Sequence, residues 1–173
     1  MRLQEIYEAA GRLFIQQGYS KTQISHIAKA VGVSVGTIYL DFAGKKDIAH
    51  FILKCVINPE YLEAEHRRPV TLEDFGRTEK EIRNTLRESN ARFSARLPVA
   101  ESGYTFEGLL SDAFDLIARY ALGILFIEKN QYDFVKLAGY YRQYRTDFFR
   151  IMNDYFTGFM DAGAIRRPLY PHY

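Results

Sequence analysis

Small and polar side chains gathered in the run Ser34-Val35-Gly36-Thr37 offer the clearest chemistry in this sequence, which is hydrogen bonding to nucleic acid. Ser34 is a suitable N-cap for a short helix that begins at Val35. Because the side chains that follow are short, the N-terminus of this helix can enter the major groove of DNA. Thr37 and Val35 would then reach base edges, including the methyl groups of thymine.

Polar side chains on either side of this run are placed to meet the DNA backbone. We expect Tyr39 and Lys45 to contact phosphates from the flank of the helix. Thr22 is the expected N-cap of a preceding helix, where its hydroxyl group and the free amides can bind a further phosphate. The expected DNA-binding residues are therefore Thr22, Ser34, Val35, Gly36, Thr37, Tyr39 and Lys45.

The elements that must position these side chains lie between Lys21 and Phe42, and they have the residue types of a helix-turn-helix. Ala28 is small enough for two helices to approach closely there. Gly32 can take the positive φ that a turn of about three residues requires. Apolar residues on both helices are expected to pack between them: Ile27, Val33, Ile38 and Phe42.

The charge distribution agrees with a DNA-reading head. Residues 1–58 carry seven lysines and arginines against four aspartates and glutamates, whereas residues 59–173 carry sixteen against seventeen. A basic segment attached to a neutral body is typical of a nucleic-acid-binding module.

Other chemistry finds little support. The histidines His26, His50, His66 and His172 lack the spacing of a metal site, and no nucleophile motif or phosphate-binding glycine loop is present. The single cysteine, Cys55, lies on an apolar helix face, which indicates a buried thiol, with a reactive sensor thiol as the alternative. We therefore expect no enzyme activity, no cofactor and no metal.

The chain is expected to avoid membranes. The most apolar stretch, residues 120–127, is too short to cross a bilayer. The first residues contain no apolar signal core, so the sequence indicates a cytoplasmic protein with no membrane partner.

Apolar residues recur at helical spacing through almost the whole chain, and hairpin signals are missing, so we predict an all-α fold. A three-helix DNA-binding domain is expected at 1–46 and a helical effector-binding and dimerisation domain at 47–173, with a linking helix over 45–58. The expected helices cover about 3–17, 23–31, 35–42, 45–58, 71–97, 105–129 and 132–162.

Connecting segments are predicted from turn residues. Residues 60–70, which contain Arg67-Arg68-Pro69, are interpreted as a linker, and residues 71–74 as a capping box. Residues 99–104 are expected to form a loop. Gly18 and Gly163 are expected to end helices.

The stretch from Ile6 to Ile48 resembles the DNA-binding domain of the TetR family. The matching pattern is Ile6-x3-Ala10-x2-Leu13-Phe14-x3-Gly18-Tyr19-x2-Thr22-x4-Ile27-Ala28-x2-Val31-Gly32-Val33-Ser34-x-Gly36-Thr37-Ile38-Tyr39-x2-Phe42-x2-Lys45-x2-Ile48. The resemblance implies a homodimeric, ligand-responsive transcriptional regulator, usually a repressor, that binds a near-palindromic operator in double-stranded DNA.

Two features depart from the family pattern. Asp41 stands where the family usually has a Tyr or His that supports the backbone contact, and we expect it to cap the helix or to pair with Lys45 or Lys46. After Gly163 too few residues follow for the two helices that usually form the family's dimer. Either the chain continues beyond this sequence, or the helices at 105–129 and 132–162 dimerise.

The body is rich in aromatic residues, which suggests a small apolar or aromatic effector lodged between its helices. The expected wall residues are Tyr120, Phe126, Tyr141 and Phe148. The alternative is a DNA-binding protein of the same fold that is controlled by a protein partner and has no small effector.

Overall fold

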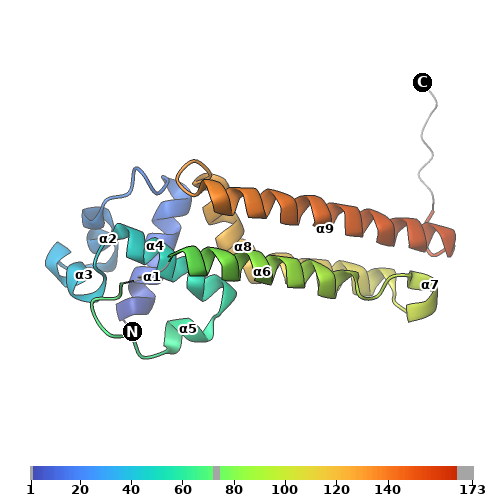
Figure 1. Cartoon of the computed structure of the whole chain (residues 1–173), viewed down its shortest axis with the longest axis horizontal. Coiled ribbons are helices and arrows are strands. Elements are labelled where there is room, and N and C mark those ends of the chain that lie inside the picture. Colours follow the sequence, from blue (N-terminus) through green and yellow to red (C-terminus); the bar gives the residue numbers. More distant parts are fainter. Residues whose placement is uncertain (1, 72–74, 167–173) are drawn as a thin grey trace, which may run out of the picture. The chain divides into compact units, whose positions relative to one another are not determined.

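The computed structural model describes residues 2–71 and 75–166, and within these ranges its regular structure is helical. The one β-type feature in these ranges is an isolated parallel bridge between Phe42 and Val70. The helices are α1 (Arg2–Gln16), α2 (Ile24–Val31), α3 (Val35–Asp41), α4 (Lys45–Ile57), α5 (Glu60–Glu63), α6 (Phe75–Ser94), α7 (Val99–Ser102), α8 (Phe106–Lys129) and α9 (Val135–Asp161) (Figure 1). The predicted all-α class is confirmed.

Most helix boundaries lie within three residues of those expected, because local signals set them. Gly32 has a φ of 81° and ends α2, and Gly163 has a φ of 71° just after α9. The N-cap of α2 was predicted wrongly, because Gln23 and not Thr22 occupies it. Residues 99–104 contain the short helix α7, where a loop was expected. The expected capping box spans residues 71–74, of which 72–74 lie outside the described residues.

The chain forms two compact units. The first consists of residues 1–85 and 120–141, and the second of residues 86–119 and 142–173. The expected domain boundary after residue 46 stays a prediction.

In the first unit, α1 to α4 enclose a small apolar core (Figure 1). Its fully buried members come from all four helices: Ile6, Ala10, Phe14, Ile27, Ile38, Ile48, Phe51 and Ile52. These residues recur at helical spacing, so each helix turns one apolar face inward. Because Ile38 of α3 is part of this core, the core fixes the orientation of α3 within the unit.

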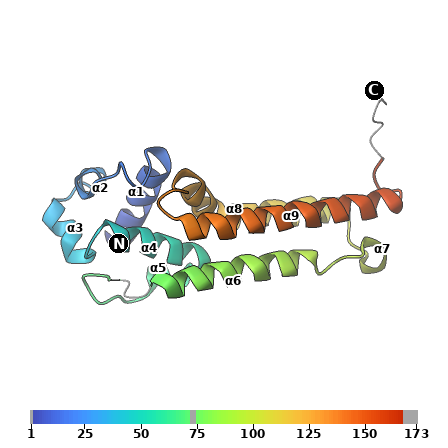
Figure 2. The ribbon, with the colours of Figure 1, turned by 45° about the horizontal axis from the view of Figure 1, so that its top comes forward.

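The turn between α8 and α9, also in the first unit, holds the turn that precedes α2 (Figure 2). Asn130 is buried, and its Nδ2 donates to the carbonyl oxygens of Phe14 and Phe126 at 3.1 and 2.8 Å. Its Oδ1 accepts the backbone amide of Tyr19. Since a buried amide with three partners has little freedom to move, Asn130 fixes this turn against the end of α8.

The segment 64–71 returns to the end of α3 and does not act as an open linker. The amide of Val70 donates to the carbonyl of Asp41 at 2.7 Å, and the amide of Ala43 donates to the carbonyl of Val70 at 3.2 Å. The prediction of a plain linker over 60–70 is therefore wrong, because α5 and this return segment occupy it. We call residues 64–71 the return segment.

The second unit has its own core, which is largely aromatic. The ring of Phe93 stacks on that of Phe148 with centroids 5.2 Å apart, and the hydroxyl group of Tyr155 donates to the carbonyl of Phe93. Ser89 and Asn90 are buried on the same face of α6 as Leu86 and Phe93. None of the helices among the described residues is long and apolar enough to span a membrane.

Candidate nucleic-acid interface

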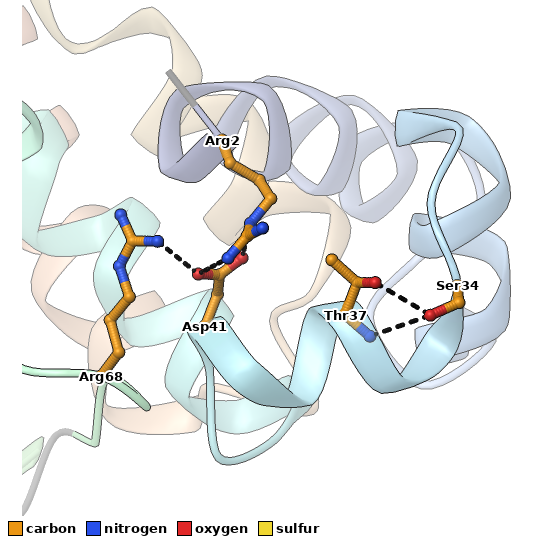
Figure 3. A network of polar contacts seen from close by, with 5 residues as sticks. All are labelled: Arg2, Ser34, Thr37, Asp41 and Arg68. Atoms are coloured by element: carbon orange, nitrogen blue, oxygen red, sulfur yellow. Dashed lines mark hydrogen bonds and ion pairs between the residues drawn. The ribbon is translucent and has the colours of Figure 1, made fainter.

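Helix α3 begins with a side-chain cap (Figure 3). The Oγ of Ser34 accepts the backbone amide of Thr37 at 3.1 Å, and the hydroxyl groups of the two residues lie 2.9 Å apart. This cap satisfies a free amide of the first turn and orders the end of the helix that is expected to meet DNA. The backbone amides of Val35 and Gly36 lie in the first turn of α3.

One face of α3 is turned to solvent. Val35, Gly36, Tyr39 and Leu40 are exposed, whereas Thr37 is half-buried and Ile38 is fully buried. An exposed fraction of 66% for Leu40 marks it as an unusual apolar surface residue. Sequence reasoning missed Leu40, although its spacing of four from Gly36 places both on one side of a helix.

Lys45 supports the turn before α2. Its Nζ donates to the carbonyl oxygens of Tyr19 and Thr22 at 2.8 and 2.9 Å, and it lies 4.2 Å from the centre of the Tyr19 ring. An ammonium group has three N–H donors, and the two carbonyl oxygens accept two of them.

Thr22 is fully buried, in contrast with the other expected contact residues. Its Oγ1 donates to the carbonyl of Gly18 at 2.7 Å and accepts from Nε2 of Gln17 at 3.1 Å. A buried hydroxyl group cannot reach DNA in this conformation, so its side chain shapes the turn. The exposed residues next to it are Lys21 and Gln23.

Asp41 at the end of α3 is fully buried and bound by two arginines (Figure 3). Arg2 donates through both Nε and Nη2, the latter at 2.8 Å from Oδ1, and Nη1 of Arg68 donates to the same Oδ1 at 2.8 Å. The expected pairing with Lys45 or Lys46 is wrong. The carboxylate instead joins the start of α1, the end of α3 and the return segment, and this binding raises the pKa of Arg2.

The four expected effector residues are buried but belong to different units. Tyr120, Phe126 and Tyr141 lie in the first unit, and Phe148 lies in the second. Phe126 packs edge-on against Phe14 and near Phe134, with centroids 5.7 and 5.1 Å away. Phe126 thus serves the packing between α8 and α1, and an effector contact for these residues stays a prediction.

Two buried groups of α4 face the core of the first unit. Burial raises the pKa of the Cys55 thiol to about 12, so Cys55 is protonated at neutral pH. Burial, followed by the charge of Lys46, lowers the pKa of His50 to about 4. Among the described residues, no group of three or more His, Cys, Asp and Glu side chains could hold a metal ion.

Comparison with known proteins places the helix-turn-helix. Residues 6–51 match the family described as bacterial regulatory proteins, tetR family. This range includes α1 to α3 and the first half of α4, and therefore the face of α3 described above.

Three relatives match the chain over segments of similar length. The fatty acid metabolism regulator protein of Bacillus subtilis (strain 168) is 44% identical over 50 residues, which are 29% of this chain and 26% of the relative. The HTH-type transcriptional regulator AcrR of Shigella flexneri is 51% identical over 45 residues, which are 26% of this chain and 21% of the relative. The HTH-type transcriptional regulator HbdR of Aromatoleum sp. (strain CIB) is 44% identical over 57 residues, which are 33% and 25% of the two chains.

The matched part thus spans only about a quarter of each of these relatives. No solved structure matches the chain. The shared part holds the capped helix α3, the turn at Gly32 and the supporting Lys45. Over residues 6–51 the chain is therefore similar to the DNA-binding part of the tetR family of bacterial regulatory proteins.

Proposed function

We propose that this protein is a homodimeric repressor that binds a near-palindromic operator and releases it when a small effector binds. The observation that carries the proposal is the exposed face of α3 behind a capped N-terminus. A helix of seven residues is about 10 Å long, which suits insertion of its first turn into a major groove about 12 Å wide.

Each residue of this surface has a role in this proposal. Val35 and Thr37 read base edges, and Gly36 allows the helix to approach closely. Tyr39 and Lys45 contact phosphates. Leu40 joins them as an apolar contact for sugar or thymine methyl groups, because it is exposed on the same helix.

Selection of bound duplexes from random DNA, followed by fluorescence anisotropy, tests DNA reading. Replacing Thr37 with Ala should cost about 1–3 kcal/mol on the selected site and relax the preference at one base position. Tyr39→Ala should instead weaken binding to selected and random duplexes alike. Thr85→Ala, which changes a half-buried threonine of α6, is the matched control. Unaltered selectivity in Thr37→Ala would contradict this placement of α3.

Dimerisation has a suitable surface in the second unit. Leu110, Phe114 and Ile117 are exposed on α8 at spacings of four and three, so they share one helix face. An exposed apolar face on a helix marks an interaction surface. To read a near-palindromic operator, a dimer must bring its two copies of α3 to successive major grooves, about 34–36 Å apart.

An effector site is supported by two buried polar side chains in the second unit. Nδ2 of Asn90 donates to the carbonyl of Tyr144 at 3.0 Å, but Oδ1 of Asn90 and Oγ of Ser89 have no hydrogen-bond partner among the described residues. Buried polar atoms are nearly always paired, and leaving one unpaired costs about 1–3 kcal/mol. An aromatic effector that carries a hydroxyl or amine group would supply the missing donor.

Thermal unfolding and operator release in the presence of phenols and aromatic amines test this part of the proposal. An active compound should raise the melting temperature of the native protein, and Asn90→Ala should remove the shift. Asn84→Ala, at an exposed position of α6, is the control. If no small molecule releases DNA and a purified protein partner does, the second candidate function, control by a partner protein, replaces the effector.

A further inference from the structure

The return segment contains two adjacent arginines and is bonded to the end of α3. Arg67 and Arg68 are both exposed, and they follow His66 directly. Nothing in the helix-turn-helix itself requires this segment, because residues 6–51 already contain the whole motif. Its position beside α3 therefore needs an explanation of its own.

The residues around Arg67 are anchored to the first unit. His66 lies edge-on to Phe51, with centroids 5.2 Å apart, and its Nε2 lies 2.7 Å from the carbonyl of Tyr61. Arg68 donates to Asp41, and Val70 is buried and bonded through its backbone to the end of α3.

Arg67 differs from these neighbours. Its side chain is exposed, and it forms no ion pair within the part of the chain that the structure describes. The segment is thus held on both sides of an arginine that has no structural task.

The charge and position of this surface suit the DNA backbone. Arg2 and Arg68 bind a single buried carboxylate at the end of α3, and Arg67 directly precedes Arg68, so the positive charges here exceed the negative charge of Asp41. Since α3 is only about 10 Å long, groups beside its last residue lie near the rim of a groove that receives its first turn. Phosphates line that rim.

We propose that the return segment is a second DNA-backbone contact, in which Arg67 binds a phosphate at the edge of the groove that receives α3. Arg68 is a positioning residue: its bond to Asp41 holds the segment in place. Side-chain exposures of 38% for Arg2 and 46% for Arg68 leave both guanidinium groups with N–H donors toward solvent. This inference rests on the proposed DNA binding.

The first test measures the affinity of the full chain for its selected duplex over a range of salt concentrations. Arg67→Ala should reduce the magnitude of the slope of log K against log salt by about one. It should weaken binding to selected and random duplexes by the same factor, roughly five- to tenfold near 0.1 M salt. Arg67→Lys should keep the slope. Arg87→Ala, at an exposed arginine of the second unit, should bind as the native protein does.

A second test locates the contact directly. Cys55 is the only cysteine and is buried, so Arg67→Cys provides a single accessible thiol for an iron-EDTA cleavage reagent. Cleavage should fall on backbone positions that border the groove occupied by α3.

The outcomes separate two failures. If the native protein ignores duplex DNA even in dilute salt, the proposed function fails and this inference fails with it. If the native protein binds but Arg67→Ala keeps the native slope, or if the reagent at residue 67 cuts nowhere near the site, only the second contact is refuted. A lower slope together with cleavage at the groove edge supports it.

Discussion

Asp41 lies in the helix that is expected to meet DNA, but its side chain has a structural role. A carboxylate near DNA would repel phosphates, yet here it is fully buried and neutralised by Arg2 and Arg68. Its negative charge thereby gathers two positive side chains at the end of α3. The departure from the family pattern at this position thus becomes a source of basic surface.

Asp41→Asn should lower the free energy of unfolding by about 1–3 kcal/mol, because the three charge-assisted hydrogen bonds from Arg2 and Arg68 become weaker. Urea unfolding of Asp41→Asn, Arg68→Ala and the double variant measures the coupling. A coupling of at least about 0.5 kcal/mol is expected for residues in direct contact. Strict additivity of the two single variants would show that the ion pair contributes nothing to stability.

His50 makes stability depend on pH in the acid range. Its pKa is lowered from 6.5 to about 4 in the folded protein, so below about pH 6.5 the unfolded chain takes up a proton that the folded chain does not bind. Stability should therefore be constant for this group above pH 6.5 and fall by up to ~3 kcal/mol between pH 6.5 and pH 4.

Chemical unfolding at several pH values measures this effect as the difference between the native protein and His50→Leu. Subtraction removes the contribution of the carboxylates, which titrate in both proteins. Parallel pH profiles for the two proteins would refute the role given to His50.

Among the secondary-structure elements, the contact between α4 and α8 has the tightest geometry. A Cβ at Gly123 would lie 2.8 Å from Cγ1 of Val56, so α8 passes α4 with no room for a methyl group. Both residues belong to the first unit. A glycine in the middle of a helix, which is unfavourable by propensity, is thus required by packing.

Gly123→Ala should destabilise the protein by about 1–3 kcal/mol through overpacking. Val56→Ala in the same chain should recover part of the loss, because it removes the methyl group in the way. Gly139→Ala is the matched control: it has nothing within 4 Å of its Cβ position in α9, and it should stabilise by ~0.5–1 kcal/mol. Thermal unfolding measures all four proteins, and equal effects of the two glycine changes would contradict the close contact.

For the molecule as a whole, the proposed dimer can be tested at the exposed face of α8. Phe114→Glu places a charge in the middle of the exposed face of α8, where Leu110 and Ile117 flank it. Burying an unpaired charge is costly, so the variant should be monomeric. Light scattering after size exclusion measures the mass, with Tyr132→Glu as the control at another exposed aromatic residue.

Operator affinity should fall with the dimer in Phe114→Glu, because each copy would then bind one half-site alone. A variant that stays dimeric would move the interface to another face of the body.

Local signals in the sequence were sufficient for the longer helices and for the helix-turn-helix, although they did not predict the short helices α5 and α7. Gly32 must take a positive φ, Ser34 must cap the helix that begins one residue later, and apolar residues at helical spacing must turn inward. These constraints act over a few residues, so they are readable without the fold. They explain why the bounds of α1 to α4 lie close to those predicted.

Tertiary structure alone decided which distant groups meet. Asp41 binds residues 39 and 27 positions away, and Asn130 binds a carbonyl 116 positions away. Hydrophobic periodicity predicts that a residue is buried, but it does not predict which distant residue it contacts. That contact depends on the path of the chain between the two residues. For this reason the sequence predicts a linker where the structure has the return segment. Its polar composition indicates solvent exposure, whereas its contacts with α3 form only when the first unit folds.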